Sequence, residues 1–210
     1  MNTPGTFIVF EGGEGGGKST QARLLAAALE QIGHRVLVTR EPGGSQRAER
    51  IRDLILADIS QAGDQPMTPR TEALLFAAAR ADHVATSIAP ALATGAVVIS
   101  DRYIDSSVAY QGVGRALGAQ VIEELSLWAV QDLLPDLTLV LDVDPEVGLA
   151  RAQDPNRMER EPLEFHQGVR ATFLELAAQS PHRYQVISAD QEPSVIERQV
   201  LATVTKELAL

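Results

Sequence analysis

The chain of 210 residues has no cysteine, few aromatic residues and fewer basic than acidic side chains. Without cysteine it forms no disulfide and no thiolate metal site. The net charge of −10 argues against a broad nucleic-acid-binding surface. No apolar run approaches the roughly eighteen residues of a membrane span, and the N-terminus lacks the pattern of a secretory signal. The four histidines show no zinc-binding spacing and are expected to be structural or surface residues.

Short apolar runs alternate with segments of helical periodicity along the whole chain. Such alternation is typical of an α/β fold in which right-handed crossovers build a doubly wound parallel sheet. We expect residues 1–210 to form a single domain, with a polar lid at about 151–164. The predicted strands are residues 7–10, 36–39, 97–100, 137–142 and 185–188, and the predicted helices are residues 18–31, 46–57, 70–88, 120–134, 164–178 and 194–208.

A glycine-rich loop follows the first predicted strand. Residues 12–19 match the pattern G-x-x-x-x-G-K-[ST] in full and lead directly into a predicted helix. Backbone N–H groups of such a loop wrap nucleotide phosphates, and the helix dipole favours their negative charge. Lys18 is expected to reach the β- and γ-phosphates, and the Ser19 hydroxyl to bind Mg²⁺. The sequence therefore predicts a P-loop nucleotide-binding protein, and the use of nucleotides favours the cytoplasm.

Charged residues also gather at the ends of the second and third predicted strands. Glu41 follows the second strand within Thr-Arg-Glu-Pro-Gly-Gly, and Arg52 comes one short helix later. Asp101 and Arg102 follow the third strand. Ligands of parallel sheets lie beyond the carboxyl ends of the strands. We therefore expect Asp101 to hold Mg²⁺ and Arg102 to face a phosphate.

Two further segments carry residues suited to a nucleotide base. Phe76 and Arg80 are four residues apart, so they project from one helix face. The ring suits stacking on a base, and the guanidinium suits a phosphate. After the third strand, Tyr110 offers a flat apolar face, and Gln111 can both donate to and accept from the edge of a pyrimidine such as thymine.

Together these segments resemble the bacterial thymidylate kinase family. The resemblance is carried by residues 10–20, 39–44, 74–80 and 101–112, with Pro-Asp-Leu-Thr at 135–138 and Arg-Met-Glu at 157–159. It implies a homodimeric P-loop enzyme that transfers the γ-phosphate of ATP to dTMP, giving dTDP for dTTP synthesis, with Mg²⁺ as cofactor.

The resemblance also implies roles for particular residues. Phe76 would stack on thymine, Gln111 would meet its edge, and Glu14 would lie near the acceptor sugar. Arg80 and Arg102 would hold the dTMP phosphate. The ATP-binding residues would be Gly12, Gly13, Glu14, Gly15, Gly16, Gly17, Lys18, Ser19 and Thr20, and the dTMP-binding residues would be Glu14, Glu41, Arg52, Phe76, Arg80, Arg102, Ser107, Tyr110 and Gln111.

Two positions depart from the pattern of some relatives. Position 15 is glycine, where some relatives carry an arginine in the loop. In relatives without that arginine the lid supplies the catalytic charge. The resemblance therefore implies that Arg151, Arg157 or Arg160 joins Lys18 and Arg102 in catalysis. Asn156 stands where the family's lid begins with Asp-Arg, which shifts the lid alignment by about one residue.

Two other classes of function remain open at this point. The first is a kinase for another monophosphate or a deoxynucleoside, although a purine would need a wider pocket and different edge partners from those that Gln111 supplies. The second is a nucleotide switch or partition-type ATPase. The sequence has no Asn-Lys-x-Asp motif for reading guanine, and Gly13 stands where partition ATPases carry a second lysine. Trp128 is expected in the core or at a subunit interface.

Overall fold

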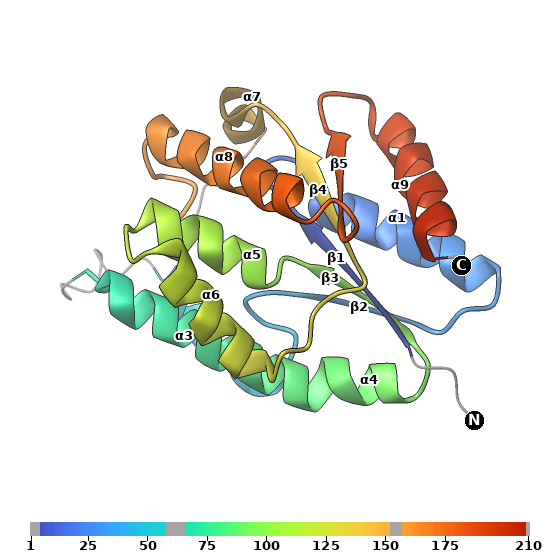
Figure 1. Ribbon diagram of the computed structural model, residues 1–210, viewed down its shortest axis with the longest axis horizontal. Helices are drawn as coiled ribbons and strands as arrows, with labels where there is room; N and C mark the ends of the chain where they lie inside the picture. The colour runs from blue at the N-terminus through green and yellow to red at the C-terminus, as the bar shows by residue number, and fades with distance from the viewer. Residues whose placement is uncertain (1–4, 58–65, 152–156, 209–210) are drawn as a thin grey trace.

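The computed structural model describes residues 5–57, 66–151 and 157–208. At its centre lies a five-stranded sheet in the order β2-β3-β1-β4-β5, with all neighbouring strands parallel (Figure 1). This confirms the predicted parallel sheet, and four of the five strands are one or two residues longer than predicted. The strands are β1 (Thr6–Glu11), β2 (Val36–Arg40), β3 (Val97–Asp101), β4 (Leu137–Asp142) and β5 (Tyr184–Ser188).

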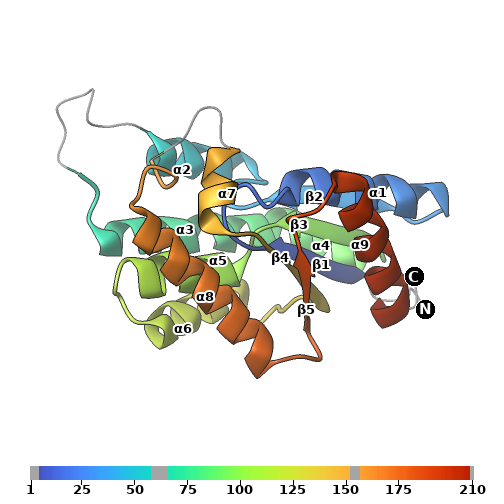
Figure 2. The same ribbon diagram turned by 90° about the horizontal axis from the view of Figure 1, so that it is seen from above.

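Helices cover both faces of the sheet, as the doubly wound topology predicts (Figure 2). Within the described residues they are α1 (Lys18–Gln31), α2 (Gln46–Leu56), α3 (Pro69–His83), α4 (Ala89–Ala93), α5 (Ile104–Ser107), α6 (Ala119–Val130), α7 (Pro145–Ala150), α8 (Leu163–Gln179) and α9 (Pro193–Leu208), with the π-helical segments η2 (Val84–Ile88) and η3 (Val108–Gly114). None of these helices combines the length and apolar character that crossing a membrane requires.

The alternation of side chains along β1 shows how the core is divided. Ile8 and Phe10 pack with α1 and α9 on one face of the sheet. Phe7 and Val9 face the other way, where they pack against residues of η2, α5 and η3. Because successive strand residues point to opposite faces, a continuous apolar run serves both layers. A third cluster, which includes Phe173, seals α8 onto η3 and β4.

Local signals in the sequence explain several helix ends. Ser45 accepts a hydrogen bond from the Ala48 N–H at 3.2 Å and caps α2. Thr68 caps α3 in the same way, directly before Pro69 at the first helical position. At the C-terminal end of α6, Gln131 adopts a left-handed conformation with φ of 52°. The helix therefore stops four residues before the predicted end at residue 134.

Several other predictions differ from the structure. The helix predicted over residues 70–88 is α-helical only to His83 and continues as the π-helical η2. Pro90 lacks an N–H and crowds the carbonyl of Thr86, which disfavours regular α-helical hydrogen bonds there. The short helices α4, α5 and α7, and η3, were not predicted. The core position considered for Trp128 is wrong, since this residue is 80% exposed.

Candidate active site

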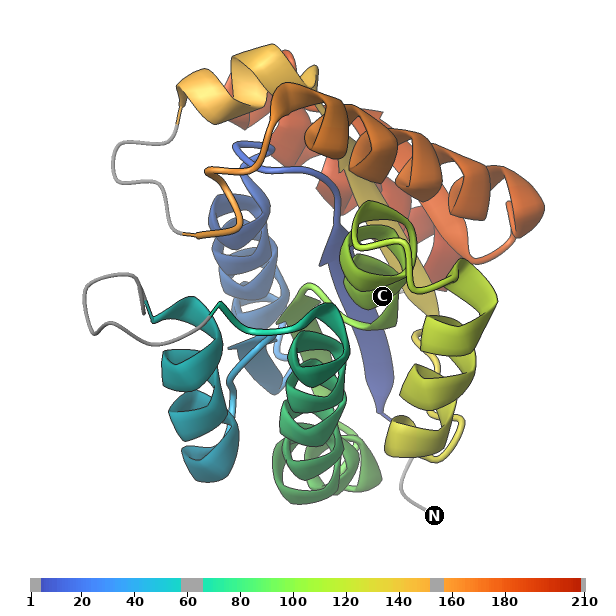
Figure 3. The same cartoon turned by 90° about the vertical axis from the view of Figure 1, so that its left-hand side faces the viewer.

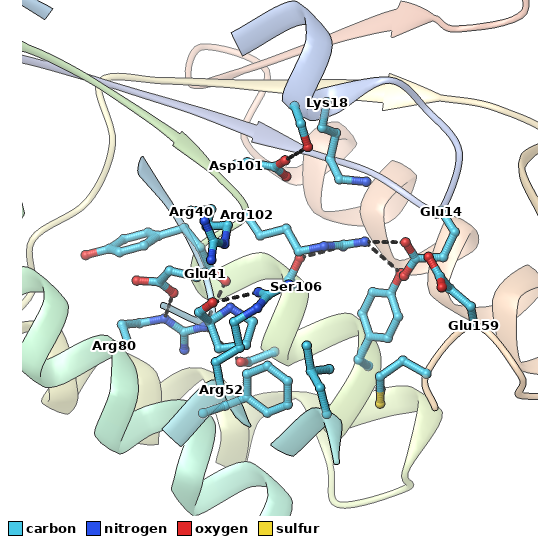
Figure 4. A pocket seen from close by; sticks show the side chains of 18 of the residues that line it. Glu14, Lys18, Arg40, Glu41, Arg52, Arg80, Asp101, Arg102, Ser106 and Glu159 are labelled. Atoms are coloured by element: carbon cyan, nitrogen blue, oxygen red, sulfur yellow. Dashed lines mark hydrogen bonds and ion pairs between the residues drawn. The ribbon is translucent and has the colours of Figure 1, made fainter. Parts of the chain in front are cut away.

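A cavity of about 390 Å³ opens at the carboxyl ends of β1, β2 and β3 (Figure 4). Asp101 at the end of β3 lies in register with Phe10 of β1 and Arg40 of β2, so the loops that follow these strands converge. The predicted site residues that line the cavity are Glu14, Gly15, Gly17, Lys18, Ser19, Thr20, Glu41, Arg52, Phe76, Arg80, Asp101, Arg102, Ser107, Tyr110 and Gln111. Most of the residues expected to bind the two nucleotides thus line one cavity, whereas Gly12, Gly13 and Gly16 of the loop are not among its lining residues.

The loop between β1 and α1 folds around its own lysine. The Nζ of Lys18 donates to the carbonyl oxygens of Gly12 at 3.1 Å and Gly13 at 2.6 Å. Burial lowers the pKa of Lys18, the charge of Arg102 lowers it further, and the charge of Glu14 opposes both. Lys18 is therefore a buried amine whose donors are directed at the loop.

Helix α7 supports the loop from behind. Gly15 has φ of +68°, and a Cβ there would collide with the backbone of Gly148 in α7. A Cβ on Gly148 would in turn collide with the carbonyl oxygen of Glu14. Arg151, at the end of α7, donates from Nη1 to the Gly15 carbonyl at 3.0 Å and to the Ala189 carbonyl at 3.2 Å. This packing leaves no room for a side chain at position 15.

Ser19 and Asp101 bring two oxygen donors together beside the loop. The Ser19 hydroxyl donates to the Oδ2 of Asp101. Among the described residues, no group of three or more His, Cys, Asp or Glu side chains is arranged to hold a metal ion without help. Mg²⁺ typically takes one or two protein oxygens and fills its remaining positions with water and phosphate oxygens. The two side chains fit such an ion.

Arg102 lies at the centre of a charged cluster on the other side of the cavity (Figure 4). Its Nη2 is 2.9 Å from the Oε2 of Glu14, and its Nη1 donates to the Ser106 hydroxyl at 3.0 Å. The guanidinium also lies 5.1 Å from the centre of the Tyr110 ring. Burial lowers the pKa of Arg102, but the charge of Glu14 and its other neighbours raises it more. Conversely, burial raises the pKa of Glu14, but chiefly Arg102 brings it down to about 2.

Arg80 is held by protein groups. Its Nε donates to Glu41 at 2.6 Å, and its Nη2 donates to the Tyr103 carbonyl and the Ser107 hydroxyl, each at 3.0 Å. Its Nη1 donates to the Ser126 hydroxyl at 3.1 Å. These bonds use four of the five N–H groups of a guanidinium. Arg80 therefore braces Glu41 and Ser107, while Arg102 is the arginine that lies beside the P-loop.

The side chains expected at the base come from α3 and η3, and Arg52, expected near the acceptor phosphate, comes from α2. Phe76 of α3 is partly exposed to the cavity. Gln111 of η3 is 1% exposed and donates from Nε2 to the Oε1 of Glu72 at 2.9 Å. Arg52 of α2 donates from Nη1 to the Pro42 carbonyl at 2.7 Å. An aromatic face and a polar amide therefore lie in the same cavity.

The three lid arginines lie in different places. Of the predicted lid, residues 152–156, which include Asn156, lie outside the described part of the chain. Arg157 donates to the Ile55 carbonyl at 3.3 Å and to Glu72 at 2.7 Å, and Arg160 is exposed. From this segment Met158 and Glu159 line the cavity. The catalytic role expected of Arg151, Arg157 and Arg160 stays a prediction.

Sequence reasoning missed several residues of the cavity and of its supporting layer. Arg40 and Ser106 line the wall, and buried Glu11 accepts from the Tyr103 N–H at 2.8 Å and from the Ser106 hydroxyl at 2.6 Å. The positions of Arg40 and Glu11 at strand ends were usable signals. Glu72 lies four residues before Phe76, on the same helix face, which was also a usable signal.

Comparisons with known proteins agree over nearly the whole chain. The family model described as "Thymidylate kinase" matches residues 10–200. The thymidylate kinase of Clavibacter sepedonicus is 50% identical over 202 residues, which cover 94% of this chain and 93% of that protein. That of Thermomicrobium roseum is 49% identical over 204 residues, with 95% and 94% covered.

The fold agrees with a solved structure as well. The crystal structure of thymidylate kinase from Ehrlichia chaffeensis matches with a TM-score of 0.79 and 33% identity, covering 96% of this chain and 100% of that chain. The range matched by the family model spans the P-loop, Asp101 and Arg102. The chain belongs to the thymidylate kinase family.

Proposed function

We propose that this chain transfers the γ-phosphoryl group of ATP to dTMP inside the cavity, in a direct in-line reaction that yields dTDP for dTTP synthesis. Phosphorylation of dTMP is the activity of the family. The observation that supports this site most strongly is that Lys18 and Arg102 line one cavity together with Phe76 and Gln111. A phosphate donor, a phosphate acceptor and a base then have suitable partners in the same space.

ATP would bind along the loop, residues 12–20. The backbone N–H groups at the start of α1 would face its phosphates. Lys18 would exchange its two carbonyl acceptors for oxygens of the β- and γ-phosphates, since a phosphate oxygen is the stronger acceptor.

The acceptor would lie across the cavity from the loop. Arg102 would hold its phosphate, with Arg52 nearby, and Arg80 would contribute mainly through Glu41 and Ser107. Phe76 would stack on the thymine ring and Gln111 would meet its edge. Glu14 and Tyr110, which are joined by a hydrogen bond of 2.8 Å, would border the sugar.

The reaction needs no general base. A phosphate monoester has a second pKa of about 6, so dTMP is mostly a nucleophilic dianion at neutral pH. The difficulty is repulsion, since two unit like charges about 4 Å apart repel by roughly 4 kcal/mol at an effective dielectric constant of 20. Lys18 and Arg102 would offset this repulsion and hold the attacking and leaving oxygens in line.

Ser19 and Asp101 would hold the Mg²⁺ ion. When bound, this ion neutralises charge on the phosphates. The Ser19 hydroxyl and the Asp101 carboxylate, now hydrogen-bonded to each other, would both turn their oxygens to it.

A lid arginine would supply the charge that glycine at position 15 cannot. Arg151 is the first candidate, because it already donates a hydrogen bond to the Gly15 carbonyl of the loop. Arg157 and Arg160 are the other candidates, although Arg157 is engaged with Glu72.

We further propose a homodimer formed by α3 and α6. The two helices lie side by side (Figure 3) and expose Leu74, Val121 and Trp128, which are 58%, 60% and 80% exposed. Large exposed apolar side chains on neighbouring helices commonly mark a protein interface. Because both substrates are free nucleotides, we propose that the enzyme acts in the cytoplasm, without nucleic-acid or membrane partners.

A coupled assay with ATP and Mg²⁺, run with and without dTMP, tests the proposed activity. We expect ADP release that depends on dTMP, and dTDP as the second product. Equal ATP consumption without an acceptor would indicate a nucleotide switch instead. A panel of other monophosphates in the same assay separates thymidylate kinase from kinases of other acceptors.

A further inference from the structure

A buried carboxylate lies directly behind the proposed base-binding amide. Glu72 of α3 is 1% exposed, and both of its oxygens accept hydrogen bonds. Its Oε1 accepts from the Nε2 of Gln111 at 2.9 Å and from the Nε of Arg115 at 3.3 Å. Its Oε2 accepts from the Nη2 of Arg157 at 2.7 Å.

The surroundings of Glu72 keep it ionised. Burial raises its pKa, but the hydrogen bonds from Gln111 and Arg157 and the charge of Arg115 lower it more. Arg115 is itself held by Glu161 at 2.6 Å and lies 5.2 Å from the centre of the Phe165 ring. An ionised carboxylate only accepts hydrogen bonds.

This fixes which way the Gln111 amide points. The amide has two chemically different ends, and only its NH₂ end can satisfy Glu72. In the reversed orientation the amide oxygen would face the buried Glu72 carboxylate. Both atoms are acceptors, and no hydrogen atom would lie between them. The Oε1 of Gln111, together with the second N–H of its Nε2, therefore remains for a ligand.

We propose that Glu72 is a positioning residue that determines base specificity, because it holds the Gln111 amide in the orientation that matches a pyrimidine imide. This rests on the proposed function, in which Gln111 meets the base edge. The edge of thymine presents an N3–H donor beside the O4 acceptor, which matches an amide oxygen beside an amide N–H. Cytosine presents an N3 acceptor beside a 4-amino donor, which requires the reversed amide.

Discrimination against 4-aminopyrimidines then comes from a penalty against the wrong ligand as well as from attraction to the right one. To bind dCMP, the enzyme would either leave mismatched donors and acceptors at the base or turn Gln111 against Glu72. Leaving a buried polar group without a hydrogen-bond partner lowers the rate or the affinity by about tenfold to hundredfold.

The test compares kcat/KM for dTMP and dCMP in four full-length proteins: the natural chain, Glu72→Gln, Gln111→Leu and the double variant. Glu72→Gln keeps the shape but can both donate and accept, so the Gln111 amide is free to reverse. We expect this substitution to lower the preference for dTMP over dCMP by about 10- to 100-fold. In the Gln111→Leu background it should cause no further change. Thermal unfolding of each protein verifies that it is folded.

Glu161→Gln is the matched control. It also removes a carboxylate from Arg115, but it does not touch Gln111. The preference for dTMP over dCMP should stay as in the natural chain. If Glu72→Gln does not fold, Glu72→Asp replaces it, because the shorter carboxylate withdraws from Gln111 and should also lower the preference.

Three results would overturn the inference. The first is an unchanged preference in a folded Glu72 variant. The second is an equal effect of Glu72→Gln with and without Gln111, which would mean a purely structural role. The third is an unchanged kcat/KM for dTMP in Gln111→Leu, which would refute the assignment of Gln111 to the base edge. This third result therefore distinguishes a failure of the proposed function from a failure of the role of Glu72.

Discussion

Arg102 and Glu14 form an ion pair of 2.9 Å within the cavity, and each holds the other in its charged form. With a pKa of about 2, Glu14 stays ionised at every pH at which the enzyme would be assayed. The guanidinium is therefore ordered before a phosphate arrives. Binding of the acceptor needs less ordering of Arg102 than it would if the side chain were free.

Replacing Arg102 by alanine should mainly damage use of the acceptor. The variant loses a charge-assisted hydrogen bond to the dTMP phosphate, and we expect KM for dTMP to rise about 10- to 100-fold with a much smaller change in KM for ATP. Steady-state kinetics with each substrate varied measure both. Arg47→Ala is the control, because Arg47 pairs with Asp82 at the surface. An unchanged dTMP dependence in Arg102→Ala would refute the role of Arg102.

Replacing Lys18 by alanine should mainly damage the chemical step. Lys18 is directed at the phosphate loop, and loss of one donor to developing charge typically lowers kcat about 10²- to 10³-fold. Binding of dTMP, measured by calorimetry without ATP, should change little. Lys206→Ala is the control, since Lys206 is exposed and pairs with Glu207. Weaker dTMP binding with a normal kcat would contradict the assignment.

Replacing glycine by alanine should have opposite effects at Gly15, which packs closely on Gly148, and at Gly168, which has free space around it. Gly15→Ala adds a methyl group that meets the α7 backbone at a positive φ, so it should lower the free energy of unfolding by about 1–3 kcal/mol and reduce activity. Gly168→Ala adds a methyl group to α8, where a Cβ meets nothing within 4 Å. It should be neutral or stabilising by up to about 1 kcal/mol. Denaturant unfolding measures both, and equal stability of the two variants would refute the packing argument.

Short-range patterns in the sequence predicted the sheet and most of the site. The glycine loop, Asp101 and Arg102 were found because each follows an apolar strand, and parallel strands bring their carboxyl ends to one edge. The spacing of four residues placed Phe76 and Arg80 on one helix face, and both line the cavity.

What the sequence did not predict depends on contacts between distant segments. Arg80 looked like a phosphate ligand, yet its donors are used by Glu41, Ser107 and other protein groups that only the fold brings to it. The segment from Ile104 to Gly114 is rich in Ser and Gly, which favour turns, and its helical structure depends on packing against α6 and α8. Propensity is overridden by tertiary contacts at such places.

The raised pKa of Glu11 predicts how the stability of the fold depends on pH. This buried carboxyl at the end of β1 has its pKa raised to about 7 by burial and by the like charge of Asp105, against the opposing effects of hydrogen bonds from Ser106 and the charge of Arg102. A carboxyl whose pKa is higher in the folded state than in the unfolded state stabilises the fold fully below the unfolded pKa of 4.5, and this contribution is lost as the pH rises through about 7.

The difference in stability between the natural chain and Glu11→Gln should therefore depend on pH. From pH 4.5 to about 7, the natural chain should lose up to about 3 kcal/mol of unfolding free energy relative to Glu11→Gln, whose amide does not titrate. Urea unfolding of both proteins across this range measures the difference. Glu124→Gln, an exposed substitution on α6, should show no such slope. A difference between the natural chain and Glu11→Gln that stays constant with pH would mean that Glu11 keeps an ordinary pKa, held ionised by the donors of Tyr103 and Ser106.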